Sequence, residues 1–171
     1  MKQALRIAQK GVLLGLLLLM VLGFTVHAAE TKTITGAKIV KSIISRNILS
    51  PSDDPKHVMS QTVREDIITS PDQDWNDLAA VSYEQADHLA GNGSHHGVIT
   101  VRHANGDETY LRYAGTDAMS VASGSAWEVT SQGTIQISGG TGKYKEMKGM
   151  GTYSGKSSPK GSSVHWEIRV E

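Results

Sequence analysis

Hydrophobic and polar residues alternate along much of the chain after residue 57. In residues 164–170 apolar side chains occupy the even positions, and polar or charged side chains occupy the odd ones. In residues 127–137 the apolar side chains share odd positions, with glutamate, threonine and glutamine between them. Such period-two alternation indicates β-strands that bury one face of a sheet.

Turn signals separate these predicted strands. Residues 98–103 and 108–113 flank Asn105-Gly106, a dipeptide that adopts the positive φ of a tight hairpin turn. The chain has 18 glycines, and its many short strands lack crossover helices between them. This organisation favours an antiparallel barrel or sandwich that is mainly β.

Two segments carry helical signals. Residues 37–48 place their apolar side chains on one half of a helical wheel, with Thr35 able to cap the start and Pro51 able to end it. We predict an N-terminal helix and linker over residues 29–56, which packs on a main domain at 57–171. The alternative is that this helix docks on a partner.

The second helical signal conflicts with a strand signal. Ser70-Pro71 begins like a helix, and residues 79–89 fit both a helical stripe and one face of a strand. We predict a short turn or helix at 71–77 followed by a strand, because closing the sheet requires a strand there.

The first 28 residues have the layout of a secretory signal. Basic residues precede an uncharged apolar run of about 15 residues, which is short of the roughly 20 needed to span a bilayer. We predict cleavage after Ala28 and a periplasmic or secreted protein with no membrane association after cleavage. The alternative is an inner-membrane protein anchored by an uncleaved signal.

Removing this segment changes the charge balance. The chain has 17 Lys/Arg and 17 Asp/Glu, and three of the basic residues lie before Ala29. The mature chain therefore has a net charge of −3, which argues against binding to nucleic acid. There is no cysteine, so the core must stabilise the fold without disulfides.

The segment Gly139-Gly140-Thr141-Gly142-Lys143 invites comparison with a phosphate-binding loop. Tyr144 follows the lysine where the motif requires Ser or Thr, and later glycines leave no room for the helix that the motif needs. We predict instead that Gly139, Gly140 and Gly142 form a structural turn between two strands.

This glycine-rich segment resembles the signature of plant dirigent proteins and allene oxide cyclases. It is still more similar to exported bacterial proteins of the same barrel superfamily. The further motifs that carry the resemblance are Gly91-Asn92-Gly93, His95-His96-Gly97, Asn105-Gly106-Asp107 and Tyr113-Ala114-Gly115-Thr116. The resemblance covers about residues 57–171. It implies an eight-stranded antiparallel barrel with a central cavity and a homo-oligomer, since relatives are often dimeric or trimeric.

Two functions are compatible with such a barrel, and a purely structural barrel whose interior is filled by side chains is a third option. The first is binding of a small apolar molecule in the lumen, and the second is a cyclase- or dirigent-like enzyme that shapes a reactive intermediate there. Arg102, Arg112 and Arg169 fall on the outward parity, so a neutral, largely apolar ligand is expected. The residues expected to line the lumen are Tyr83, Asp87, His103, Tyr113, Trp127 and Trp166.

The histidines give no metal-binding motif. His95 and His96 are adjacent, so on a strand they point to opposite faces, and no spacing typical of zinc ligands occurs. We expect no metal and no cofactor. A Gly-x-Ser-x-Gly nucleophile motif is also absent from the sequence.

Overall fold

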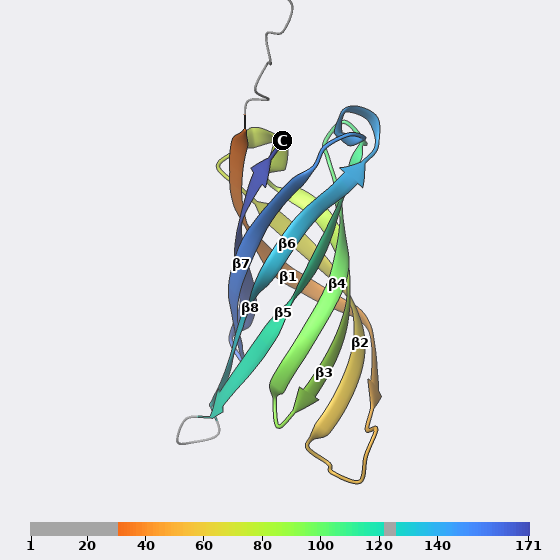
Figure 1. Ribbon diagram of the computed structural model, residues 1–171, viewed down its shortest axis with the longest axis vertical. Helices are drawn as coiled ribbons and strands as arrows, with labels where there is room; N and C mark the ends of the chain where they lie inside the picture. The colour runs from red at the N-terminus through yellow and green to blue at the C-terminus, as the bar shows by residue number, and fades with distance from the viewer. Residues whose placement is uncertain (1–30, 122–125) are drawn as a thin grey trace, which may run out of the picture. The chain divides into compact units, whose positions relative to one another are not determined.

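The computed structural model describes residues 31–121 and 126–171. In these residues eight antiparallel strands follow one another in chain order around a closed barrel (Figure 1), which confirms the predicted mainly β, eight-stranded fold. The predicted signal segment, residues 1–28, lies outside the described residues. The strands are β1 (Lys32–Leu49), β2 (His57–Thr69), β3 (Leu78–Leu89), β4 (Asn92–Arg102), β5 (Glu108–Val121), β6 (Trp127–Gly140), β7 (Gly149–Ser158) and β8 (Gly161–Val170).

The predicted N-terminal helix is wrong, because residues 32–49 form strand β1. This strand pairs with β2 on one side and with β8 on the other, from Lys32↔Val170 to Ile39↔Ser163. The boundary predicted at residue 57 is therefore wrong as well. Without β1, β2 and β8 would expose unpaired edges, and β1 closes the barrel between them.

Two register shifts explain why the sequence of β1 looks helical. The pairing with β2 shifts between Val40 and Ser42 and again between Ile43 and Ser45. Each irregularity breaks the period-two alternation, so apolar residues recur at spacings of three and four. The abundance of isoleucine and valine, which favour strands over helices, was the contrary signal.

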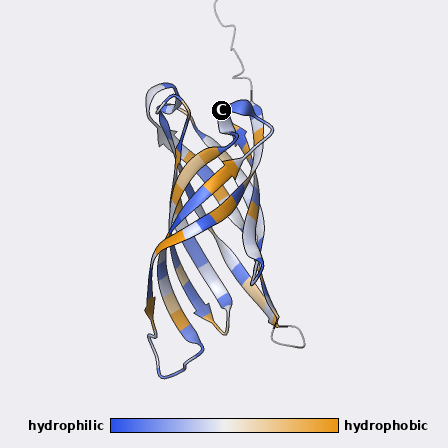
Figure 2. Cartoon of the chain, turned by 180° about the vertical axis from the view of Figure 1, so that it is seen from behind, coloured by the Kyte–Doolittle hydropathy of each residue, from blue (hydrophilic) through white to orange (hydrophobic). Residues whose placement is uncertain are grey.

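Because consecutive strands run in opposite directions, the connections between them divide into two sets at the two ends of the barrel. Strands β1, β3, β5 and β7 end, and strands β2, β4, β6 and β8 begin, at one end of the barrel, here called the open end. The β2–β3, β4–β5 and β6–β7 connections lie at the opposite, closed end, together with the start of β1 and the end of β8 (Figure 1). Hydrophobic and hydrophilic residues alternate along the strands (Figure 2), as expected for a sheet with one inward face.

Trp75 plugs the closed end. It belongs to η1 (Gln73–Trp75), a 3-10 turn capped by Asp72, so the predicted short turn at 71–77 followed by a strand is confirmed. The indole is 1% exposed and makes edge contacts with the rings of His103 and Trp166 at centroid distances of 5.1 and 5.8 Å. Below it, fully buried Val101, Ile137 and Ile168 fill the lumen.

The predicted hairpin at Asn105-Gly106 is confirmed. Gly106 has a φ of +86°, and the amide of His103 donates to the carbonyl of Asp107 at 2.9 Å. No helix long and apolar enough to cross a membrane occurs in the part of the chain that the structure describes.

The predicted glycine turn begins later than expected. Strand β6 continues through Gly140, and the chain then turns through η2 (Gly142–Tyr144). Gly139 and Gly142 have φ values of +129° and +50°, which glycine accommodates. Gly140 lies close to backbone instead: a Cβ there would stand 2.1 Å from the carbonyl oxygen of Glu108.

Candidate functional site

The open half of the lumen is a cavity of about 380 Å³. The apolar core bounds this cavity on the side of the closed end, and this boundary is here called the floor. Ile99, Ile135 and Trp166 pack in the core and also line the cavity. Polar and charged side chains make up much of the wall between this floor and the open end. They are Lys38, Arg46, Ser60, Thr62, Arg64, Glu84, His88, His95, Tyr113, Asp117, Ser131, Tyr153, Ser157 and Ser162.

An ion pair between β2 and β3 forms the first polar group of the wall. Arg64 Nη2 donates to Glu84 Oε1 at 2.6 Å, and the Tyr113 hydroxyl from β5 donates to Glu84 Oε2 at 3.1 Å. Burial opposes the charge of Glu84, but the hydrogen bond and charge of Arg64 outweigh it and lower the pKa of Glu84. Burial, with the neighbouring Glu84 charge, raises the pKa of Tyr113.

A second charged group lies deeper. Lys38 Nζ is 3.6 Å from Asp66 Oδ2, and the same oxygen accepts a hydrogen bond of 2.5 Å from Ser82. Burial lowers the pKa of Lys38, and the attraction to Asp66 offsets only part of this effect. Asp66 Oδ1 is buried without a hydrogen-bond partner among the described residues. The hydrogen-bonding capacity of the Asp66 carboxylate is therefore only partly used.

A third group joins two histidines to an aspartate. Asp117 Oδ2 lies 2.8 Å from His88 Nε2 and 2.9 Å from His95 Nδ1, and Asp117 Oδ1 accepts from the Ser131 hydroxyl at 2.5 Å. His95 Nε2 lies 2.5 Å from the Tyr153 hydroxyl. Although burial raises the pKa of Asp117, these hydrogen bonds hold it well below its usual range. The hydrogen bond to Asp117 raises the pKa of His88.

Three of the predicted lumen residues line this cavity. Tyr113 and Trp166 are buried on its wall and floor, and Trp127 is 37% exposed and also lines it. The inward face predicted for β5, β6 and β8 is therefore correct at these positions.

The parity predicted for β3 is wrong. Tyr83 and Asp87 point outward, and the even-numbered residues Ser82, Glu84 and His88 point inward. The error arose because most inward residues of β3 after Ala80 are polar, Ala86 excepted, so a rule that assigns the more apolar face to the interior selects the wrong face there. Asp87 instead bonds to His57 on the outside, with 2.8 Å between Oδ1 and Nε2.

His103 is buried, but it lies in the plug at the closed end and does not line the cavity. Its Nδ1 is 2.8 Å from the carbonyl oxygen of Asp74, its Nε2 is 2.7 Å from the Thr109 hydroxyl, and its ring stacks on Tyr144. Burial lowers the pKa of His103. These contacts give the imidazole a packing role.

The sequence reasoning missed the charged lining. Arg102, Arg112 and Arg169 are exposed as predicted, but Lys38 and Arg64 face inward. One available signal was the pair Leu78 and Ala80: extending their parity along β3 leads to Ser82, Glu84 and His88. The residues brought from other strands could not be grouped without the register.

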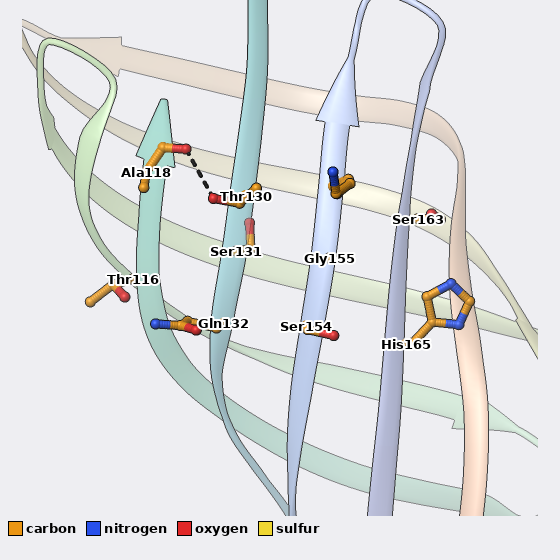
Figure 3. A pocket seen from close by; sticks show the side chains of 10 residues that line it. Thr116, Ala118, Thr130, Ser131, Gln132, Ser154, Gly155, Ser163 and His165 are labelled. Atoms are coloured by element: carbon orange, nitrogen blue, oxygen red, sulfur yellow. Dashed lines mark hydrogen bonds between the residues drawn. The ribbon is translucent and has the colours of Figure 1, made fainter. Parts of the chain in front are cut away.

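A separate hollow of about 420 Å³ lies on the outer face of β5, β6, β7 and β8 (Figure 3). Serine and threonine make up half of the residues that line it, and the Thr130 hydroxyl donates to the carbonyl of Ala118 at 3.3 Å. Among the residues that line this hollow only Ala118 has an apolar side chain, whereas the lumen offers an apolar floor with large side chains and polar groups on its wall. The lumen is therefore the stronger candidate.

Comparison with known proteins gives no family assignment: no protein-family model matches the chain, and neither does any curated protein. The resemblance to the allene oxide cyclase and dirigent barrels stays a prediction.

Proposed function

We propose that the protein binds a small amphipathic molecule in the open half of its barrel. The observation that carries this proposal is the layered cavity of about 380 Å³, apolar at its floor and charged along its wall. Ligand cavities typically combine a mainly apolar lining with a few convergent polar groups.

The lining also suggests how such a molecule would be oriented. Its apolar part would rest on Ile99, Ile135 and Trp166, where burial of apolar surface is favourable. A carbonyl, hydroxyl or carboxylate would face the wall. The guanidinium of Arg64 carries five donors, and its bond to Glu84 holds it in place to offer others to a ligand.

This proposal revises the neutral, apolar ligand that the sequence favoured. That expectation depended on cationic side chains facing outward. With Lys38 and Arg64 on the wall, a ligand that is apolar throughout would cover charged groups without replacing the hydrogen bonds they make to water. A ligand with one polar end avoids this cost.

The ionisation of four groups on the lining favours binding over acid–base catalysis. A general acid or base works best with a pKa near the working pH. The pKa values of Glu84 and Asp117 are lowered and those of Tyr113 and Tyr153 are raised, so these four groups are held in one ionisation state near neutrality. The pKa values of Lys38 and His88 shift toward neutrality instead, so these two are the lining groups best placed to exchange a proton. The fixed negative charges of Glu84 and Asp117 and the neutral hydroxyls of Tyr113 and Tyr153 are suited to orienting a ligand.

One observation favours the cyclase- or dirigent-like alternative. Tyr153, His95 and Asp117 form a continuous hydrogen-bonded chain on the cavity wall, which is an arrangement that can move a proton. Membership of the allene oxide cyclase or dirigent superfamily, and the oligomeric state it implies, belong to this second proposal.

Binding can be tested with anilinonaphthalene sulfonate, an amphipathic fluorescent probe. We expect naphthoate and naphthalene methanol to displace it at roughly tenfold lower concentration than naphthalene, because each adds a polar end. Equal competition by naphthalene would contradict the amphipathic ligand class.

Two neighbouring residues of β6 provide matched variants for locating the probe. Val129 lines the lumen and Thr130 lines the outer hollow. Val129→Trp should reduce probe binding at least roughly tenfold, and Thr130→Trp should leave it unchanged. The opposite result would place the binding site on the outer face and overturn the proposal.

Export belongs to the proposed function too, because residues 1–28 have the layout of a secretory signal. Mass spectrometry of the exported protein should find Ala29 as its first residue. Recovery of the full-length chain in the inner membrane would support the uncleaved anchor instead.

A further inference from the structure

Three adjacent strands bring two imidazoles and a carboxylate together near the open end of the lumen. His88 comes from β3, His95 from β4 and Asp117 from β5. All three line the cavity, and their side chains are 25%, 4% and 11% exposed. We propose that these residues bind a divalent transition-metal ion of the zinc class, independently of the amphipathic ligand proposed above.

Gly93 makes the convergence possible. It lies between His88 and Asp117 in the register of β3, β4 and β5, and a Cβ at this position would stand 2.8 Å from His88 Cδ2. Since glycine has no side chain, the imidazole of His88 leans across β4 to reach the carboxylate. Gly115, paired with His95, similarly makes room for the Tyr153 hydroxyl.

The spacing of the donor atoms fits one shared ion. Asp117 Oδ2 is 2.8 Å from His88 Nε2 and 2.9 Å from His95 Nδ1, and all three donors lie within 4.8 Å of one another. Ligands at about 2.0–2.2 Å from one zinc ion are separated from each other by roughly 3–3.5 Å. Small side-chain adjustments therefore suffice to coordinate an ion.

The surrounding hydrogen bonds are those of a supported metal site. Metal-bound histidines usually use their second ring nitrogen in a hydrogen bond, and metal-bound carboxylates are themselves hydrogen-bonded. Here His95 Nε2 faces Tyr153 at 2.5 Å, and Asp117 Oδ1 accepts from Ser131. When Nδ1 binds a metal, His95 Nε2 carries the proton and donates to the Tyr153 oxygen, so the same contact serves both states.

The donor set indicates the class of ion. Imidazole nitrogens favour zinc, iron, cobalt, nickel and copper, whereas calcium and magnesium favour oxygen ligands alone. Three protein ligands also leave at least one coordination position directed into the cavity, for water or a donor atom of a bound molecule. The expectation of no metal followed from the absence of a spacing motif, which cannot detect ligands from three different strands.

The outer pair His57–Asp87 offers a matched control. Its nitrogen–oxygen distance is also 2.8 Å, but it contributes two donors on the outer face. His57→Ala therefore removes a similar histidine–aspartate contact without touching the proposed site.

The test is titration of the EDTA-treated protein with zinc chloride by calorimetry, and with cobalt chloride by visible absorption. We expect one equivalent per chain. His88→Ala and Asp117→Asn should weaken zinc binding at least ten- to a hundredfold, and His57→Ala should leave it unchanged. Tyr153→Phe should weaken binding less than His88→Ala does and should retain the cobalt spectrum.

Circular dichroism separates loss of binding from loss of folding, and His88 is the main test because its side chain is partly exposed. The proposal is wrong if His88→Ala folds and binds zinc as tightly as the unmodified protein does. It is also wrong if the unmodified protein binds less than one equivalent of zinc per chain. Zinc binding retained in Val129→Trp, together with lost probe binding, would show that the two sites are separable.

Discussion

The two halves of the barrel interior differ in how their side chains occupy the lumen. At the closed end, Trp75 and the side chains around it fill the lumen completely, and Val101, Ile137 and Ile168 have no exposed surface. In the open half, charged groups such as Arg64 and Glu84 bind each other along the wall and leave a cavity.

The difference follows from what each kind of side chain needs. Apolar side chains gain from every contact, so they close over the centre until no void is left. Charged side chains must keep a partner or water, so they stay at the wall in fixed pairs. We infer that the closed end provides most of the stability and that the open half is available for binding.

The largest expected effect comes from removing the plug. Trp75→Ala should lower the free energy of unfolding by about 3–5 kcal/mol, because it leaves a large cavity in a region with no room to collapse. Trp127→Ala, at the open half and 37% exposed, should cost less than about 1 kcal/mol. Urea denaturation measures both, and equal costs would refute the division of roles.

A smaller effect is expected from the charged wall. Lys38→Met leaves the buried carboxylate of Asp66 without its cation and should cost about 2–3 kcal/mol. Changing both residues, as Lys38→Met with Asp66→Asn, should bring stability back to within about 1 kcal/mol of the original protein. If the double variant is as unstable as the single one, charge pairing does not organise this wall.

The glycines at the closed end should tolerate substitution according to what surrounds them. Gly140→Val forces a side chain against the Glu108 carbonyl and should cost about 1–3 kcal/mol. Gly106→Ala meets no atom within 4 Å and should cost only about 1 kcal/mol, through its positive φ.

The same variants test whether this loop binds nucleotide. Thermal unfolding with and without ATP should show no stabilisation of either the original protein or Gly140→Val. Tight ATP binding that is lost in Lys143→Ala would restore the phosphate-loop interpretation.

The smallest expected effect is a difference in pH dependence between the two halves. The pKa of His88 is raised above 6.5 by Asp117, so its stabilising contribution is present below pH 6.5 and is lost as the pH rises through the folded-state pKa. The pKa of His103 is lowered by burial, so its contribution is present above pH 6.5 and is lost as the pH falls through the folded-state pKa.

Unfolding in EDTA-containing buffer at pH 5.5 and pH 8 measures this difference. The cost of His88→Ala should be larger at pH 5.5, and the cost of His103→Gln should be larger at pH 8. If the loss in unfolding free energy changes with pH in the same direction for both variants, the opposite pKa shifts assigned to His88 and His103 are wrong.

Several features of the fold could be predicted because local chemistry dictates them. Alternation in residues 164–170 requires a strand with one buried face, whatever its partners are. Asn105-Gly106 favours a hairpin because its backbone tolerates positive φ. Ser70-Pro71 likewise favours the turn that carries Trp75.

Tertiary structure decided the rest, because it depends on which strands become neighbours. Residues 37–48 became a strand since β2 and β8 required a partner to close the barrel, and bulges disguised the pattern. The inward face of β3 was set by register with β2 and β4, against its apolar–polar pattern. His88 and His95 lie on the two strands of one hairpin and Asp117 lies on the next strand, and the three meet because the register places Gly93 between His88 and Asp117. Local patterns determine which segments form strands and turns, whereas a site built across strands is determined by their pairing.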